Sequence, residues 1–362
     1  MPASKPRVSL ASNREVRDIY IDAADLARLG TFADFHWEEF NEASSWDAPP
    51  DVSPETDARF TALCRTSDAL IVCHGSPRVT DRILAAAPGL KVIGELEGDR
   101  FAQRMDVEAA AARGVRALDT THGSSYPVSE WALAMMMIGL RNAGAHFRKI
   151  IAGGWWADED ERRADSGFLR GELTGKTVGL IGCGHIGRKL LEYLKPFGCT
   201  VLVHDPYIPK EVADIYGFTL TSLDKALSVP DVVVCLAPLT PATKGMLGRR
   251  EFGLLRPGAV FVNVSRGAIM QTDALIERLR KKDIVACLDV FNPEPVPQDS
   301  PVRQMENVFL TPHIAGVTAR SRTRFFELMV DELRRFFEGH ETRHDLLPRT
   351  MANRRGTPPP GR

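Results

Sequence analysis

Three polar residues in the second half of the chain could together perform acid–base chemistry. Each follows a short apolar run: Arg266 in VNVSRG, Glu294 in LDVFNPEP and His313 in LTPHIAG. A guanidinium can hold a carboxylate through two parallel hydrogen bonds. An imidazole can exchange a proton with a hydroxyl or carbonyl oxygen, and a carboxylate can fix the imidazole tautomer. A single histidine after an apolar run is more often structural, but the presence of Arg266 and Glu294 at matching positions favours an acid–base site.

A glycine-rich turn is the second candidate site. The segment GCGHIG, residues 182–187, directly follows the apolar run 177–181 and opens into a helix-like stretch. With a strand before it and a helix after it, this spacing is typical of a dinucleotide-binding turn, in which the helix N-terminus faces the pyrophosphate. We therefore predict that a dinucleotide is bound by Gly182, Gly184, His185, Ile186 and Gly187.

An acidic residue at the end of the next apolar run selects the cofactor. Asp205, in TVLVHDPY, lies 18 residues beyond Gly187, close to the usual spacing of about 20. A carboxylate accepts a hydrogen bond from a free ribose 2′-hydroxyl and repels a 2′-phosphate. The next residue, Pro206, brings no compensating cation. NAD(H) is therefore predicted rather than NADP(H).

The elements that must position these residues are short β-branched runs alternating with helical stretches, which is typical of α/β layers around a parallel sheet. Because the carboxyl ends of parallel strands share one edge, where such folds bind ligands, the polar residues are expected to converge. Six runs in the second half predict a complete doubly wound domain: 177–181, 200–204, 231–236, 259–264, 285–290 and 308–311. A first α/β domain is indicated by the runs 69–73, 90–94 and 115–119.

Length and composition agree with two ordinary domains. A chain of 362 residues with 44% hydrophobic and 26% charged residues can bury two cores. A formal net charge of -1 gives no support for a nucleic-acid partner. No apolar run reaches bilayer length, the N-terminus lacks a signal-peptide core, and the six cysteines form no C-x-x-C pair. These features predict a reduced, cytoplasmic protein with no membrane or metal site.

Two helical segments have further implications. The segment 128–152 contains WALAMMMIGL, which is apolar on every side, so we expect it to pack on its own sheet and on a second subunit. The final helix, around 319–338, follows the last strand and could cross back onto the first domain. The Pro-, Gly- and Arg-rich segment 346–362 is predicted to be a disordered tail.

The ordered set GCGHIG, HDPY, CLAPLTPAT, VNVSRGAIM, LDVFNPEP and TPHIAG resembles the D-isomer-specific 2-hydroxyacid dehydrogenases, from about Gly123 to Gly316. The resemblance implies a Rossmann NAD-binding domain, 122–316, inserted into a discontinuous flavodoxin-like catalytic domain, 1–121 and 317–345. It also implies a cleft between the domains and a homodimer built on the nucleotide domain. By this resemblance, Arg266 binds substrate, Glu294 and His313 form the catalytic pair, and the cofactor is contacted by Asp289, Cys235, Ala237, Pro238 and Thr240.

The chain departs from this family where substrate is selected. Most members carry a short glycine-rich loop whose amides bind the substrate carboxylate, but here the segment 94–100 reads GELEGDR. Either backbone amides still bind the substrate while the charges are solvated or paired with Arg100 or Arg104, or the loop selects a larger, polyhydroxylated or partly cationic substrate. The candidate substrate-binding residues are Glu97, Gly98 and Ser76. His74 is not assigned a catalytic role.

The predicted activity is NAD-dependent interconversion of a D-2-hydroxy acid and its 2-oxo acid. A short-form 3-phosphoglycerate dehydrogenase is the first alternative, with Arg78 and Arg100 as the cations nearest to a phosphate. An NAD-sensing corepressor-like binding protein shares the motifs but belongs to another functional class. Formate dehydrogenases are a weaker alternative, because they typically pair the histidine with glutamine rather than glutamate.

Overall fold

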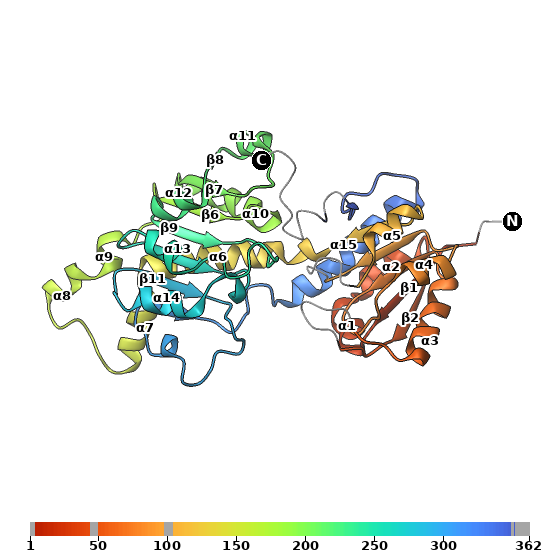
Figure 1. Cartoon of the computed structure of the whole chain (residues 1–362), viewed down its shortest axis with the longest axis horizontal. Helices are drawn as coiled ribbons and strands as arrows, with labels where there is room; N and C mark the ends of the chain where they lie inside the picture. The colour runs from red at the N-terminus through yellow and green to blue at the C-terminus, as the bar shows by residue number, and fades with distance from the viewer. Residues whose placement is uncertain (1–3, 44–49, 98–103, 349–350, 352–362) are drawn as a thin grey trace. The chain divides into compact units, whose positions relative to one another are not determined.

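The computed structural model describes residues 4–43, 50–97, 104–348 and 351, which form two compact units (Figure 1). Unit 1 comprises Met1–Ser124 and Thr318–Arg354, and the body of unit 2 is Ser125–Val317. The chain therefore leaves its first unit, builds the second and returns. The cuts lie at 124/125 and 317/318, against 121/122 and 316/317 expected from the sequence.

Unit 1 is a five-stranded parallel sheet in the order β2-β1-β3-β4-β5, with helices between the strands. The sequence indicated β3, β4 and β5 but not the first two strands. The elements are β1 (Arg7–Ser12), α1 (Arg14–Tyr20), α2 (Ala23–Gly30), β2 (Asp34–Glu39), α3 (Pro54–Arg65), β3 (Ala69–Val72), α4 (Asp81–Ala86), β4 (Val92–Glu95), α5 (Val107–Ala112), β5 (Arg116–Asp119) and α15 (Ala319–Phe337).

The core of unit 1 explains why the chain returns to it. Successive residues of β3 point to opposite faces, so Leu70 and Val72 join one buried cluster while Ala69 and Ile71 join another. α15 covers the second face with five buried side chains: Phe325, Phe326, Met329, Val330 and Leu333. Burying each large apolar side chain contributes about 1.5–3 kcal/mol. The returning helix therefore supplies a substantial part of this core.

The prediction of a disordered tail over 346–362 is wrong at its start. Leu346 and Met351 are 3% and 1% exposed and pack in the core cluster that contains Val72. The backbone nitrogen of Leu346 also donates to the carbonyl of Ala117 at 2.8 Å. The segment is mostly polar, so its composition does not reveal that these two apolar side chains are buried in a core. Residues 349–350 and 352–362 lie outside the described residues.

Unit 2 is built on a seven-stranded parallel sheet in the order β12-β11-β10-β9-β6-β7-β8. All six predicted strands are present, and a two-residue edge strand, β8, was too short to be predicted. The elements are α6 (Ser125–Leu140), α7 (Ala143–Ile151), α8 (Glu159–Ala164), α9 (Ser166–Arg170), β6 (Thr177–Ile181), α10 (His185–Leu194), β7 (Thr200–His204), α11 (Lys210–Tyr216), β8 (Thr219–Leu220), α12 (Leu223–Ser228), β9 (Val232–Cys235), α13 (Arg249–Leu254), β10 (Val260–Asn263), α14 (Thr272–Leu279), β11 (Val285–Leu288) and β12 (Val308–Leu310).

Both faces of this sheet are covered, as the continuous apolar strands require. Along β9, Val232 and Val234 belong to one core cluster, while Val233 and Cys235 belong to the cluster on the other face. The predicted fold class, two doubly wound parallel-sheet domains, is confirmed. No helix within the described ranges is both long and apolar enough to cross a membrane.

Candidate active site

The glycine-rich turn between β6 and α10 has the backbone geometry that its sequence predicts. Gly182 has a φ of +89°, and a Cβ there would lie 2.8 Å from the Cα of Ala237, so only glycine fits. Gly187 packs the helix against the turn, because its Cβ would lie 3.2 Å from the carbonyl oxygen of Gly182. A Cβ at Gly184 would meet nothing within 4 Å. Space is therefore open directly at the N-terminus of α10.

Asp205 connects the end of β7 to this turn. One carboxylate oxygen, Oδ2, accepts a hydrogen bond from the backbone nitrogen of Cys183 at 2.8 Å, and Oδ1 accepts one from the nitrogen of Tyr207 at 2.9 Å. The residue is half-buried. Its carboxylate is thus held next to the glycine turn by two backbone donors.

These residues fit a dinucleotide. The ten-residue helix α10 begins at His185, and Ile186 follows in its first turn. Its N-cap residue, Gly184, has no side chain to satisfy the helix amides. Amide donors, the positive end of the helix dipole and open space at Gly184 suit a pyrophosphate. The carboxylate of Asp205, directly after β7, suits a ribose hydroxyl.

The segment after β9 borders the glycine turn, but its side chains are mostly turned inward. Cys235 is fully buried, and burial raises the pKa of its thiol to about 12, so the structure gives this side chain a packing role. Ala237 and Thr240 are 5% and 4% exposed, whereas Pro238 is exposed. The carbonyl of Ala237 accepts from the hydroxyl of Ser265. The predicted cofactor contacts of these residues remain predictions.

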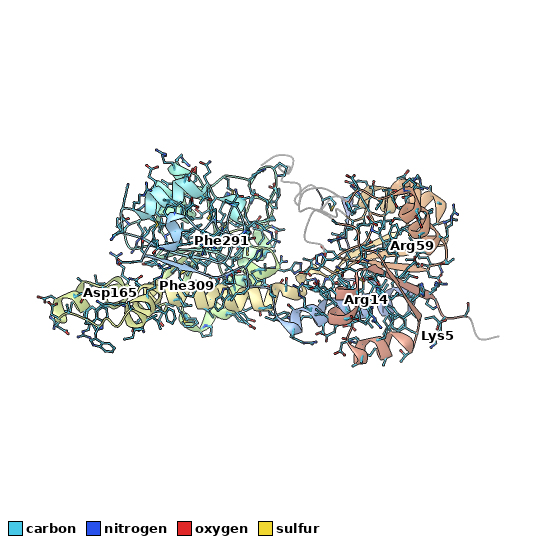
Figure 2. The ribbon with its side chains drawn as sticks, turned by 90° about the horizontal axis from the view of Figure 1, so that it is seen from below. Lys5, Arg14, Arg59, Asp165, Phe291 and Phe309 are labelled. Carbon is cyan, nitrogen blue, oxygen red and sulfur yellow. The ribbon has the colours of Figure 1, made fainter. Side chains whose placement is uncertain are left out.

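His313 and Glu294 form a hydrogen-bonded pair. Nδ1 of His313 lies 2.9 Å from Oε2 of Glu294, and the two side chains are 33% and 36% exposed. The other carboxylate oxygen of Glu294 accepts from the backbone nitrogen of Phe291 at 3.1 Å, so the carboxylate is fixed from both sides (Figure 2 labels Phe291). Because a carboxylate only accepts, the proton lies on Nδ1 and the accepting nitrogen of the neutral ring is Nε2.

Asp289 fixes the backbone that carries His313. Its fully buried carboxylate accepts hydrogen bonds from the hydroxyl of Thr311 at 2.5 Å and from the nitrogens of Ile314 and Ala315, both at 2.9 Å. His313 itself adopts a left-handed φ of 55°, and its nitrogen donates to the carbonyl of Asp289 at 2.9 Å. Such backbone strain persists where the surroundings determine it, and it clusters at functional sites. A direct cofactor contact by Asp289 stays a prediction.

The turn that carries Arg266 is packed against the segment that carries Glu294. A Cβ on Gly267 would lie 1.8 Å from the carbonyl oxygen of Phe291, so this close approach requires glycine. Nη1 of Arg266 donates to the carbonyl of Ser265 at 2.7 Å, and the residue is half-buried. Unit 2 therefore brings the ends of β10, β11 and β12 together with Arg266, Glu294 and His313 on adjoining segments.

The two glutamates of the departing segment in unit 1 are both ion-paired. Glu95 is 2% exposed, and its Oε1 accepts from Nη1 of Arg104 at 2.9 Å. Oε2 of Glu97 lies 2.5 Å from Nη1 of Arg322. Pairing with Arg104 was one of the alternatives left open by the sequence, whereas Arg322, from α15, was not foreseen. Gly98 and Arg100 lie outside the described residues.

Ser76 is 1% exposed, and its hydroxyl donates to the carbonyl of Pro77 at 2.8 Å. Its predicted contact with substrate stays a prediction. Two other residues were missed. Thr311 bridges Asp289 and the indole nitrogen of Trp131, and Tyr20 donates to Glu97. No short-range pattern could reveal contacts across 180 or 77 residues of sequence.

Comparisons with known proteins bear on the family and on the cofactor. Residues 133–315 match the family model described as D-isomer specific 2-hydroxyacid dehydrogenase, NAD binding domain, which confirms the resemblance and identifies NAD as the cofactor of this domain. The chain is 33% identical over 277 residues to a D-3-phosphoglycerate dehydrogenase of Methanocaldococcus jannaschii, covering 76% of this chain and 51% of that protein. It is 38% identical over 240 residues to a mitochondrial formate dehydrogenase of Solanum tuberosum, covering 66% and 61%.

The chain thus spans about half to three fifths of the length of these curated relatives. Among solved structures, a phosphoglycerate oxidoreductase from Rhizobium etli superposes with a TM-score of 0.76 over 94% of this chain and 98% of that one. At 21% identity, that similarity supports the fold alone.

Proposed function

Because the chain belongs to the D-isomer specific 2-hydroxyacid dehydrogenase family, we propose that it interconverts a D-2-hydroxy acid and its 2-oxo acid with NAD(H). One observation carries this proposal: His313 is bound to Glu294 through Nδ1, on a backbone fixed by Asp289, which leaves Nε2 to exchange a proton. A carboxylate-oriented imidazole at the same edge of the sheet as an NAD-binding turn suits oxidation of a secondary alcohol.

The glycine turn and Asp205 would hold the cofactor. Amides at the start of α10, next to Gly184, would bind the pyrophosphate, and Asp205 would accept from the adenosine ribose. When bound, the nicotinamide supplies hydride transfer. The protein then has to bind the acid, place its reacting carbon and move one proton.

Arg266 and His313 would perform those tasks. The guanidinium of Arg266 suits the substrate carboxylate, which it can bind through two parallel hydrogen bonds. Nε2 of His313 would take the proton of the substrate hydroxyl during oxidation and return it to the carbonyl oxygen during reduction. Glu294 would stabilise the imidazolium that forms, as a carboxylate behind a catalytic imidazole does.

The test is oxidation of NADH by the purified chain with glyoxylate, pyruvate, hydroxypyruvate and 3-phosphohydroxypyruvate. Turnover of a 2-oxo acid, lost in His313→Asn but with NADH affinity retained, supports the proposal. A wild-type chain that binds NADH and reduces none of these acids would contradict it and favour an NAD-sensing binding protein.

Substrate preference separates the two activities that the curated relatives carry. A strong preference for 3-phosphohydroxypyruvate would favour a phosphoglycerate dehydrogenase, as in the M. jannaschii relative. Reduction of NAD by formate would favour a formate dehydrogenase, as in the potato relative, although the glutamate at position 294 argues against it.

A homodimer through the helices of 128–152 and the segment that follows them is part of the proposal. Eight of the thirteen exposed large hydrophobic residues of the described chain lie between positions 126 and 169: Tyr126, Met137, Phe147, Ile150, Ile151, Trp155, Phe168 and Leu169. α7, α8 and α9 extend to one side of unit 2, where Asp165 is labelled (Figures 1 and 2). Met135 and Met136 are fully buried while Met137 is 39% exposed, so α6 has both an inner and an outer apolar face.

Sedimentation tests this surface. Trp155→Asp, at a side chain 73% exposed, should convert a dimer into a monomer. Ile215→Asp, at a side chain 76% exposed on α11, is the matched control and should leave the dimer intact. A wild-type chain that sediments as a monomer at micromolar concentration would contradict the dimer.

A cytoplasmic location is also proposed. All six cysteines are free thiols, and five of them are buried. Free cysteines are usual in a reducing compartment. Fractionation of the host cells checks the location.

A further inference from the structure

The backbone that carries His313 needs support from elsewhere in unit 2. Its φ of 55° lies in the left-handed region, which is unfavourable for a residue with a side chain. The nitrogen of His313 donates to the carbonyls of Asp289 and Thr311, at 2.9 and 3.0 Å. The direction in which the imidazole points, and hence the position of Nε2, therefore depends on these two residues.

The carboxylate of Asp289 holds the segment that contains His313. It is fully buried and accepts three hydrogen bonds, two of them from the backbone nitrogens of Ile314 and Ala315. The third donor is the hydroxyl of Thr311, at 2.5 Å from Oδ1. Within the described part of the chain, no cation pairs with this carboxylate, and Thr311 is the only side chain that donates to it. Because a buried carboxylate relies on its donors, the hydroxyl of Thr311 helps to hold it in place.

The hydroxyl of Thr311 is oriented in turn by Trp131. Its single proton is donated to Asp289, so its oxygen can only accept from another group. Nε1 of Trp131 lies 3.4 Å from that oxygen, and an indole nitrogen only donates. The direction of both hydrogen bonds is thus fixed: Trp131 donates to Thr311, and Thr311 donates to Asp289. The first bond is the longer and the weaker of the two.

Trp131 lies on α6, a helix that packs directly on the sheet. A Cβ on Gly139 of this helix would collide with Cγ1 of Val260 in β10, so the close approach requires glycine. Ser129, two residues before Trp131, is fully buried, and its hydroxyl donates to the carbonyl of Ile186 in the first turn of α10, at 3.0 Å. α6 therefore contacts both the helix that follows the glycine-rich turn and the hydroxyl that supports the acid–base histidine.

We infer that Trp131 and Thr311 are positioning residues for the reaction. The hydrogen bonds from Trp131 through Thr311 to Asp289 set the position of Nε2 of His313. This inference rests on the proposed function and deepens it, because it adds to the acid–base pair a support that begins on α6 and lies entirely within unit 2. Since a displacement of about 1 Å can lower a rate about 100-fold, such a support affects kcat more than it affects binding.

The test measures kcat at saturating NADH, with the 2-oxo acid of the panel above that the wild type reduces fastest. Thr311→Val keeps the shape of the side chain but removes the hydroxyl, so kcat should fall about 30-fold. Thr311→Ser keeps the hydroxyl and should retain kcat within about threefold of the wild type. In both variants the affinity for NADH should stay within about twofold. A merely structural role would lower the thermal unfolding midpoint and leave the kcat of the folded enzyme unchanged.

Trp131→Phe tests the first hydrogen bond. It keeps an aromatic ring but removes the indole N–H, and kcat should fall about fivefold, because the bond is weak. In the Thr311→Val background the same change should lower kcat less than about twofold, since the acceptor is already gone. The matched control is Trp37→Phe, which removes an indole hydrogen bond of 3.2 Å to the hydroxyl of Ser12 in unit 1. It should leave kcat within about twofold.

The outcomes separate this inference from the proposed function. An unchanged kcat in Thr311→Val, or equal losses on Trp131→Phe in the two backgrounds, would overturn the inference while the dehydrogenase proposal stands. A wild type that reduces none of the 2-oxo acids would remove the proposed function and, with it, the inference. Losses that Thr311→Ser avoids and that are not additive between Trp131 and Thr311 support it.

Discussion

The two units each hold a histidine hydrogen-bonded to a glutamate, and the two pairs differ in what the second ring nitrogen contacts. The distances are 2.9 Å for His313 and Glu294 in unit 2, and 3.1 Å for His74 and Glu97 in unit 1. The histidine side chains are similarly exposed, at 33% and 39%. His74 has Arg104 on its other nitrogen, whereas Nε2 of His313 makes no hydrogen bond with any residue of the described ranges.

A carboxylate partner therefore does not by itself make a histidine catalytic. In unit 1 the imidazole is held by Arg104 and in turn donates to Glu97, so neither ring nitrogen is left to exchange a proton. In unit 2 the glutamate orders the ring, and the exposed functional atom is a nitrogen that can gain or lose a proton. Four substitutions test this difference.

The largest effect is expected for His313→Asn. Asparagine retains a donor close to the position of Nδ1 but has no nitrogen that can exchange a proton, so kcat should fall about 1000-fold. The affinity for NADH, measured by fluorescence titration, should stay within about twofold. An equal loss of NADH binding would mean that the pair supports the cofactor site rather than the chemistry.

The next effect concerns acid stability in unit 1. Burial alone would raise the pKa of Glu97. In the folded chain, hydrogen bonds from His74 and Tyr20 and the charge of Arg322 instead lower this pKa from 4.5 to about 2, so the stabilisation is complete well above pH 4.5 and is lost as the pH falls from there towards 2. The full contribution is about 3 kcal/mol. Urea unfolding of the wild type and Glu97→Gln should therefore differ most at pH 7, differ less as the pH falls below 4.5, and converge only as the pH approaches 2. A difference that is independent of pH would contradict the ionised pairing.

A smaller effect is expected for Glu294→Gln. The amide oxygen can still accept from Nδ1 of His313, so the tautomer is kept, but the charge that stabilises the imidazolium is lost. We expect kcat to fall about tenfold, less than in His313→Asn. Unchanged turnover would reduce Glu294 to a packing role.

The smallest effect on turnover is expected for His74→Gln. Glutamine can still donate to Glu97 from its amide nitrogen but loses the hydrogen bond from Arg104, at a cost of about 1 kcal/mol in unfolding free energy. The fall in kcat with pyruvate should stay far below the roughly 100-fold that removal of an acid–base group causes. A fall in kcat comparable to that of His313→Asn would indicate that His74 also acts in catalysis and would contradict the difference between the two pairs.

Unit 2 was largely predictable because its information is local. A glycine turn between a strand and a helix, an aspartate one strand later and polar residues after buried runs all lie within short windows. The strands of unit 2 are continuous apolar runs, so β6, β7 and β9 to β12 were all expected. β2 was missed because it is at most half-buried and only two of its six residues, Phe35 and Trp37, are apolar.

The pairing of Glu97 was not predictable, because its geometry depends on long-range contacts. Arg322 reaches Glu97 across 225 residues, from a helix that returns to unit 1 after the whole of unit 2. The two glutamates are visible in the sequence, but the arginines that pair with them, Arg104 and Arg322, are fixed only by the fold. Burial of Leu346 and Met351 was missed for the same reason, because it depends on distant segments of the chain and cannot be predicted from local composition.

The two backbone hydrogen bonds of Asp205 constrain any attempt to redesign this protein for NADP. The usual exchange replaces the acidic residue with a small neutral one, so that a 2′-phosphate is tolerated. Here that exchange would also withdraw the acceptor from the nitrogens of Cys183 and Tyr207, loosening the turn that receives the pyrophosphate. An engineer would need asparagine or serine in a rotamer that still reaches Cys183, with the new cation placed on another residue.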